Sequence, residues 1–253
     1  MVKKIVGTGV LLVLALALQA GVKMYTLKSP DGKVKLEVTA GQGIAYSLFY
    51  DGRLLLKPSR IALHTDLPEA DHWENIRITG TKQRHVSETV QAPFYRVKEF
   101  GIDCNELELR LNNGFSLLMR AYNDGMAYRF VAGRKGEMTV VEERAEFNFA
   151  DDFEAYIPYS TNPKDPWNMA FQNFYTKAPL TQYNTELPAF LPLTVDVGAV
   201  KLTLLESDLE AYPGMFVCGD GKTPALKGVF AAYPQETFKN KWRCQETVKT
   251  CRP

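Results

Sequence analysis

The segment Lys33-Val-Lys-Leu-Glu-Val38 alternates charged and apolar residues one by one, directly after the turn sequence Ser29-Pro-Asp-Gly32. Successive side chains of a β-strand point to opposite faces, so this order places Val34, Leu36 and Val38 on one face and the charges on the other. The segment therefore predicts an antiparallel strand with one face in a hydrophobic core and the other in water.

The same two features recur along the chain. Glu106-Leu-Glu-Leu-Arg-Leu111 and Val200-Lys-Leu-Thr-Leu204 repeat the alternation. The best helical candidate, residues 206–212, is short. We therefore expect an all-β fold of two large facing antiparallel sheets with little helix. Turn sequences that favour positive φ separate the strand candidates: Tyr50-Asp-Gly52, Asn112-Asn-Gly114, Asn123-Asp-Gly125 and Gly219-Asp-Gly221.

Length and charge narrow the function classes. The chain has 253 residues, with 30 Lys and Arg against 29 Asp and Glu, and a formal charge of +1. A nucleic-acid-binding domain carries a basic excess or stripe, which this balance lacks, so we expect no nucleic-acid partner. No linker, low-complexity tract or internal repeat marks a boundary. After the leader described next, we expect one domain over residues 21–253.

Residues 1–20 have the pattern of a secretory signal peptide. Lys3 and Lys4 precede an apolar run over residues 5–18, and the segment ends at the small residue Ala20. The run is shorter than the about 20 apolar residues that span a bilayer. We therefore expect a periplasmic or secreted protein with no membrane attachment after cleavage; an uncleaved N-terminal anchor is the alternative.

Export would bring the four cysteines into an oxidising compartment. There, three disulfide pairings are open, and free thiols are the alternative. Their spacing matches no zinc motif. The cysteines are Cys104, Cys218, Cys244 and Cys251.

Residue types alone provide no catalytic constellation. His64, His72 and His85 lie in no H-E-x-x-H motif and accompany no G-x-S-x-G elbow. Glu142-Glu143 and Asp151-Asp152 are sequence neighbours, which point to opposite faces of a strand and so do not flank one glycosidic bond. We therefore assign no catalytic residue and interpret both pairs as solvated strand or turn positions.

The most suggestive loop begins with Tyr156-Ile-Pro-Tyr-Ser-Thr-Asn-Pro-Lys-Asp-Pro-Trp167-Asn. Tyrosine and tryptophan rings stack on the apolar faces of sugars, and amides bond sugar hydroxyls. We predict carbohydrate binding by this loop; the alternative is that Trp167 packs the loop onto the sandwich. The predicted contact residues are Tyr156, Tyr159, Trp167, Asn168, Asn173 and Tyr175.

A family resemblance rests on several motifs in order along the chain, and Ser29-Pro-Asp-Gly-Lys33 is the first of them. Arg120-Ala-Tyr-Asn-Asp-Gly-Met-Ala-Tyr-Arg-Phe130 resembles the R-x-Y-x-D-G-x-A-(F/Y)-R-(F/Y) signature in the N-terminal domain of glycoside hydrolase family 97. Tyr46-Ser-Leu-Phe-Tyr-Asp-Gly52 precedes it, as in that family. Glu142-Glu-Arg-Ala-Glu-Phe-Asn-Phe149 and Leu205-Glu-Ser-Asp-Leu-Glu-Ala-Tyr-Pro-Gly-Met215 follow it. The resemblance thus extends along the mature chain.

The resemblance implies a β-super-sandwich that packs, in secreted bacterial α-glucosidases and α-galactosidases, on a C-terminal (β/α)8 barrel. That barrel carries the catalytic carboxylates and most of a calcium site. The N-terminal domain would lend one glutamate from an E-x-x-Y motif. The matching stretch here is Gln172-Asn-Phe-Tyr175, so Gln172 replaces the glutamate. An amide oxygen suits Ca²⁺ but brings no charge, so we expect calcium only together with a catalytic barrel.

A family enzyme would continue past Trp242 into the barrel, whereas this sequence stops at Pro253. We therefore expect a non-catalytic domain, inactive alone, that binds an oligosaccharide or α-glycoside in bacterial polysaccharide utilisation. The alternatives are one half of a split α-glycosidase, active only with a separately encoded catalytic barrel, and a truncated inactive product. A mutarotase-type sandwich would have to rely on the three histidines. The sugar, its linkage, the disulfide pairing and the oligomeric state stay open.

Overall fold

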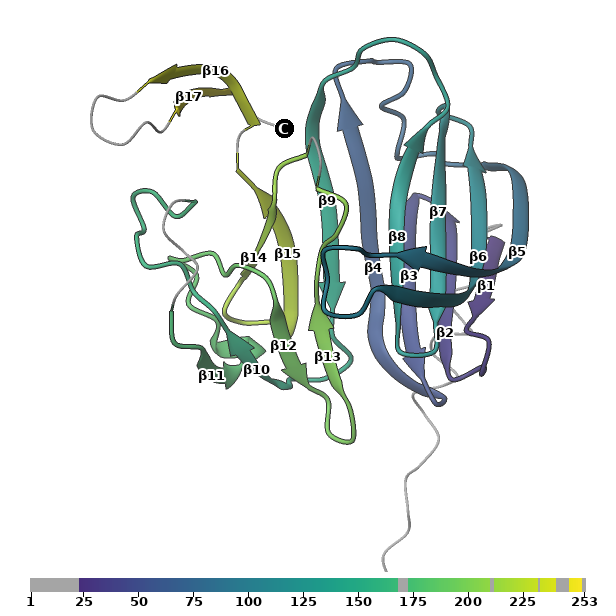
Figure 1. Cartoon of the computed structure of the whole chain (residues 1–253), viewed down its shortest axis with the longest axis horizontal. Helices are drawn as coiled ribbons and strands as arrows, with labels where there is room; N and C mark the ends of the chain where they lie inside the picture. Colours follow the sequence, from purple (N-terminus) through teal and green to yellow (C-terminus); the bar gives the residue numbers. More distant parts are fainter. Residues whose placement is uncertain (1–22, 168–172, 210–211, 232, 240–245, 252–253) are drawn as a thin grey trace, which may run out of the picture. The chain divides into compact units, whose positions relative to one another are not determined.

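The computed structural model describes residues 23–167, 173–209, 212–231, 233–239 and 246–251 (Figure 1). Within these ranges the chain is built of antiparallel strands, and its helical content is one 3-10 turn, η1 (Leu180–Gln182). The predicted all-β antiparallel class is confirmed. The leader predicted over residues 1–20 lies outside the described residues.

The chain divides into two compact units. Unit 1 combines residues 1–53 and 72–134, and unit 2 combines residues 54–71 and 135–253. The single domain expected over residues 21–253 stays a prediction.

Unit 1 is a sandwich of two antiparallel layers. In one layer, β1 (Lys23–Lys28), β2 (Val34–Gly41) and β3 (Gly43–Tyr50) are neighbours in that order. The other layer has the order β5 (Ile78–Gln91), β6 (Glu99–Leu111), β7 (Phe115–Tyr122) and β8 (Gly125–Ala132). Because β1 lies against β6 and β7, and β2 against β7, the core of unit 1 sits between the two layers.

The core of unit 1 follows the predicted alternation. Val34, Leu36 and Val38 are buried along β2, and the residues between them are half-buried. Strand β7 repeats the pattern, with Phe115 and Leu117 among its buried residues. Fully burying an aliphatic or aromatic side chain contributes about 1.5–3 kcal/mol, so these alternating strands supply much of the stability of the unit.

The predicted turns are present, with one difference. Gly32, Gly52, Gly114 and Gly221 have φ between 66° and 85°, in the left-handed region where a Cβ is costly. Gly125 has no positive φ and is already the first residue of β8. The strand therefore begins inside the sequence that predicts the turn.

Unit 2 contains two groups of neighbouring strands and a separate two-stranded ribbon. The first group has the order β4 (Arg53–Thr65), β9 (Val140–Asn148), β15 (Ala225–Phe230) and β14 (Met215–Gly219). The second has the order β11 (Thr176–Pro179), β10 (Glu154–Ile157), β12 (Leu193–Asp196) and β13 (Lys201–Leu204). Strands β16 (Tyr233–Lys239) and β17 (Glu246–Cys251) form the ribbon.

Tyr183 fastens a loop of unit 2 to β14. Its hydroxyl lies 2.7 Å from the carbonyl oxygen of Val217 and 3.0 Å from that of Leu187, so it donates to one of the two acceptors at a time. A Cβ at Gly219 would lie 2.7 Å from the tyrosine ring. Glycine is therefore required at this point of closest approach.

The segment expected to be a short helix is not helical in its described part. Residues 206–209 form no helical turn, and Asp208 has φ of 62°. Glu206 instead accepts a hydrogen bond from the backbone N–H of Met215 through Oε2, at 2.7 Å. The helix prediction is wrong there because this carboxylate closes a loop.

A second carboxylate, Glu143, lies near Glu206 and is half-buried. Tyr212 donates its hydroxyl to Glu143 Oε2 at 2.6 Å. Burial raises the pKa of Glu143 and outweighs the opposing hydrogen bond from Tyr212, and the charge of Glu206 raises this pKa further. The expectation of a solvated edge at Glu142-Glu143 therefore holds for exposed Glu142 but is wrong for Glu143.

Cys104 and Cys218 are free thiols. Burial raises the pKa of both, which leaves them protonated at neutral pH. Cys244 and the side chain of Cys251 lie outside the described residues, so pairing between those two stays open. No helix in the described ranges is long and apolar enough to cross a membrane.

Leu117→Ala should lower the free energy of unfolding by about 2–5 kcal/mol, because this side chain is fully buried. Its neighbour Leu118 lies on the opposite face of β7 and is only half-buried, so Leu118→Ala should cost less than half as much. Urea unfolding followed by circular dichroism measures both losses. Equal losses at the two positions would contradict the alternation.

Glu143→Gln should flatten the pH dependence of stability. A carboxyl whose pKa is higher in the folded state contributes its full stability below the ordinary carboxyl pKa of about 4.3 and loses it as pH rises through the raised value. The amide removes this loss and keeps an oxygen that accepts from Tyr212. Urea midpoints should therefore favour the variant at pH 7 and converge with those of the wild type near pH 4. The matched control is Glu142→Gln at the exposed neighbour; a change of equal size there would refute the assignment.

Candidate functional site

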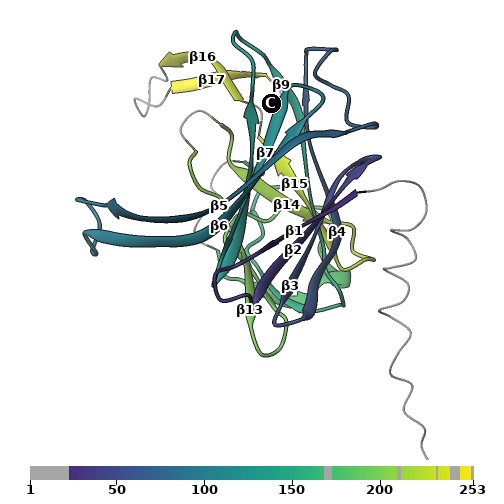
Figure 2. The same ribbon diagram turned by 90° about the vertical axis from the view of Figure 1, so that its right-hand side faces the viewer.

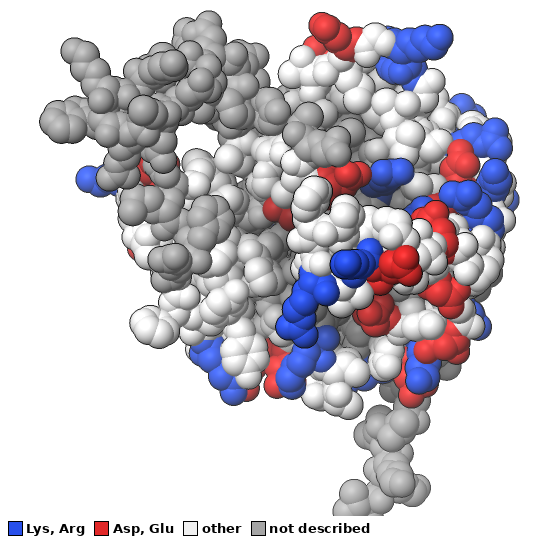
Figure 3. Space-filling view, viewed as in Figure 1, with Lys and Arg blue, Asp and Glu red and all other residues white. Residues whose placement is uncertain are grey.

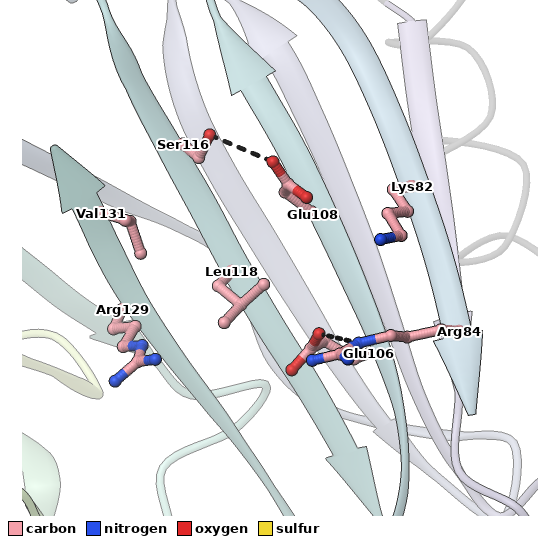
Figure 4. A pocket seen from close by; sticks show the side chains of 8 residues that line it. All are labelled: Lys82, Arg84, Glu106, Glu108, Ser116, Leu118, Arg129 and Val131. Atoms are coloured by element: carbon pink, nitrogen blue, oxygen red, sulfur yellow. Dashed lines mark hydrogen bonds and ion pairs between the residues drawn. The ribbon is translucent and has the colours of Figure 1, made fainter. Parts of the chain in front are cut away.

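A groove of about 360 Å³ opens on the outer face of the β5–β8 sheet (Figure 4). Each of the four strands contributes two residues that are two positions apart, because alternate side chains of a strand share one face. The intervening residues, such as Leu107 on β6 and Leu117 on β7, are buried in the core of unit 1. The lining residues are Lys82, Arg84, Glu106, Glu108, Ser116, Leu118, Arg129 and Val131.

Glu106 is the buried charge of this groove, with only 4% of its surface exposed. It lies directly opposite Arg84 on β5 and Arg120 on β7. The Nε atoms of these arginines lie 2.6 Å from Oε1 and 2.7 Å from Oε2, respectively. Burial acts to raise the pKa of Glu106, but the hydrogen bonds and charges of the two arginines outweigh it and hold this pKa below the ordinary value. Glu106 is therefore ionised at neutral pH.

The other end of the groove combines polar and apolar groups. Ser116 Oγ lies 3.5 Å from Glu108 Oε1, and Arg110 Nε lies 3.7 Å from the same oxygen. Leu118 projects between this end and the Glu106 end, with Arg129 on its far side (Figure 4). The groove thus offers cationic donors, carboxylate acceptors and an apolar patch within one concave surface.

Charges of both signs are also interspersed over the visible surface of unit 1. Figure 3 shows blue and red side chains side by side there, without separation into a field of one sign. Such a surface favours ligands that need donors and acceptors together over strongly charged ones.

The loop predicted to bind carbohydrate is held partly by its own contacts. Trp167 packs edge-on against Phe216, with ring centroids 5.0 Å apart, and keeps 38% of its surface exposed. The backbone N–H of Asn184 donates to the hydroxyl of Tyr159 at 2.8 Å. Asn173 donates its amide to the carbonyl of Tyr159. These contacts fit the alternative in which Trp167 packs the loop onto the sandwich.

The remaining predicted contact residues make fewer contacts within the protein or lie outside the described residues. Tyr175 is 45% exposed, and its hydroxyl donates to the carbonyl of Pro192 at 3.3 Å. Tyr156 is half-buried within β10. Asn168 and Gln172 lie outside the described residues. Carbohydrate binding by this loop stays a prediction.

The described part of the chain contains no side-chain cluster of the kind that binds a metal ion, and this applies to the expected calcium as well. Within it, no group of three or more His, Cys, Asp or Glu side chains is placed to hold a metal ion. Gln172, the residue expected to lie near calcium, is outside that part. Calcium binding together with a catalytic barrel therefore stays a prediction.

Sequence reasoning missed the groove, although part of its signal was visible. The alternation in residues 106–111 places Glu106 and Glu108 on the face of the strand opposite the core. Arg120 and Arg129 are the first and last arginines of the motif over residues 120–130, and both lie on the groove face. Nothing in the sequence indicated that Arg84 would stand opposite Glu106, because only the register of β5 against β6 decides that.

The chain is similar to proteins of a known family. The family model described as "Glycosyl-hydrolase 97 N-terminal" matches residues 27–249. A retaining α-galactosidase from Bacteroides thetaiotaomicron is 38% identical over 231 residues, which cover 88% of this chain and 34% of that protein. A probable retaining α-galactosidase from Streptomyces bingchenggensis is 26% identical over 158 residues, or 61% of this chain and 24% of that protein.

Solved structures show the same fold. A glycoside hydrolase family 97 enzyme from Pseudoalteromonas sp., in complex with panose, matches with a TM-score of 0.68 at 18% identity, covering 81% of this chain and 32% of that one. A β-arabinopyranosidase matches with a TM-score of 0.69 at 20% identity, covering 82% and 35%. The chain thus spans about a third of the length of these relatives. With the family model matching most of its length, the chain belongs to the glycosyl-hydrolase 97 N-terminal family.

Proposed function

We propose that this chain is an exported, non-catalytic domain that binds α-linked oligosaccharides, α-galactosides in particular. The groove on the β5–β8 sheet is the observation that carries this proposal. The identity of 38% to a retaining α-galactosidase supports the choice of sugar. The complexes of structural relatives with panose and acarbose support an oligosaccharide as the class of ligand.

The chemistry of the groove suits a sugar. Pyranose hydroxyls donate and accept hydrogen bonds, while the C–H groups of the ring form apolar faces. Glu108 and Lys82 would supply an acceptor and a donor, and Leu118 with Val131 would contact a ring face. A volume of about 360 Å³ lies within the range of small-molecule sites, about 300–1,000 Å³. Glu106 would hold Arg84 and Arg120 in place, and the neighbouring groups would contact the ligand.

A second candidate function is one half of an α-glycosidase whose catalytic part is a separate chain. The identity of 38% to a retaining α-galactosidase supports a role in α-glycoside hydrolysis. Any calcium would then be expected at the joint site. Co-purification of such a catalytic chain, with α-galactosidase activity only in the mixture, would support this function.

Export rests on residues 1–20, whose basic start and apolar run motivate the proposal. N-terminal sequencing of the protein from its native host should begin near residue 21. An intact Met1 in a cytosolic fraction would overturn it.

Isothermal titration with melibiose and panose should show binding, and Glu108→Ala should weaken it about tenfold or more. Hydrogen bonds to a charged group contribute about 1.5–3 kcal/mol, and 1.4 kcal/mol corresponds to tenfold. Glu154→Ala, which removes an exposed carboxylate on β10, is the matched control and should bind normally.

Trp167→Ala separates the groove from the aromatic loop. Binding lost in Trp167→Ala but kept in Glu108→Ala would move the site to the loop and contradict the groove. No heat with either sugar would refute the carbohydrate-binding function itself.

A further inference from the structure

The hairpin of β5 and β6 extends beyond the sandwich of unit 1. Figure 2 shows it projecting from the body of that unit. The last buried pair along the hairpin is Val86 on β5 and Cys104 on β6, which are register partners. The remaining part, residues 87–103, is called the arm. Its residues are exposed, apart from half-buried Ala92 and Ile102.

The two faces of the arm differ in character. One face carries the register pairs Val90–Phe100 and Glu88–Ile102. Tyr95 from the connecting turn extends it, with its ring centroid 5.4 Å from that of Phe100. On the opposite face, the pairs are Ser87–Asp103, Thr89–Gly101 and Gln91–Glu99, the last joined by a hydrogen bond of 2.9 Å.

The apolar residues of this face are exposed. Val90 is 41% exposed, Phe100 38% and Tyr95 65%. Alternating apolar residues on one face of a strand normally mark a buried face. An isolated two-stranded ribbon is also marginally stable in water, and contiguous exposed apolar surface marks an interaction site. The arm is therefore suited to packing against a partner.

The charges of the arm identify the kind of partner. Arg96 and Lys98 lie in the turn at its tip, whereas Glu88 lies near its base, on the same face as Val90. When two arms pack face to face and antiparallel, the basic tip of each lies over the acidic base of the other. The arm is thus complementary to a second copy of itself, as a twofold interface requires.

We propose that two copies of this chain form a dimer through their arms. The apolar faces pack on each other around a twofold axis, with Val90, Tyr95 and Phe100 at the centre. Glu88 of each copy pairs with Arg96 of the other copy. By strand alternation the apolar face of the arm continues the groove face of β5, where Glu88 follows Arg84 by four positions, but the interface uses none of the groove-lining residues. The proposal does not depend on carbohydrate binding.

Sedimentation equilibrium of the full chain tests the proposal between about 1 and 100 μM. The wild type should be a dimer at the upper end of this range. Phe100→Ser and, independently, Val90→Ser should weaken the dimer at least tenfold. The matched control is Met24→Ser, which removes an apolar side chain that is 50% exposed on β1, outside the arm. Far-UV circular dichroism verifies that each variant is folded.

Charge exchange tests the geometry at two exposed positions, with far-UV circular dichroism again verifying the fold. Glu88→Arg and Arg96→Glu should each weaken the dimer, because each places like charges opposite each other across the axis. The double variant should restore it, because a twofold interface reconstitutes both pairs. A monomeric wild type at 100 μM, a dimer that survives Phe100→Ser and Val90→Ser, or a double variant no better than the single ones would overturn the proposal.

Discussion

In unit 1, the strand register that places alternate residues in the core also places the residues between them in the groove. Along β6, Leu107 and Leu109 enter the core, while Glu106 and Glu108 between them face the groove. A slip of one residue would exchange the two sets and bury both carboxylates among aliphatic side chains. The same constraint acts on β5, β7 and β8, so the hydrophobic core fixes the positions of the charged groups.

On this sheet, Glu106 is the residue whose buried charge needs compensation. An unpaired carboxylate at this depth would be destabilising, because burial removes the water that solvates its charge. Arg84 and Arg120 compensate the charge from the two neighbouring strands. In turn, the three residues hold β5, β6 and β7 in register beside the lining of the groove. This accounts for a structural role of the first arginine in the family motif.

Strands β5 and β6 serve both proposed surfaces. Near the sandwich they supply Lys82, Arg84 and Glu108 to the groove, and farther along they form the arm. The change occurs at Val86 and Cys104, the last buried pair along the hairpin. In contrast, the aromatic loop of unit 2 uses Trp167, Tyr159 and Asn173 in contacts of its own. A sequence pattern of aromatic residues in a polar loop therefore fits a loop that packs against its own protein as well as a loop that binds a ligand.

The sequence by itself determined the all-β class and the faces of the strands, because alternation is a local property of the backbone. Val34, Leu36 and Val38 were placed correctly on that basis. Tertiary structure alone decided that Glu106 is buried and Glu108 is not, although both have the same local pattern. The reason is the register of β5 and β7, which sets two arginines beside Glu106. Likewise, residues 206–209 are not helical, and Glu206 there accepts a hydrogen bond from the backbone N–H of Met215, nine residues further along the chain. Local spacing fixes which way a side chain points, whereas the partner it meets depends on strands that are distant in the chain.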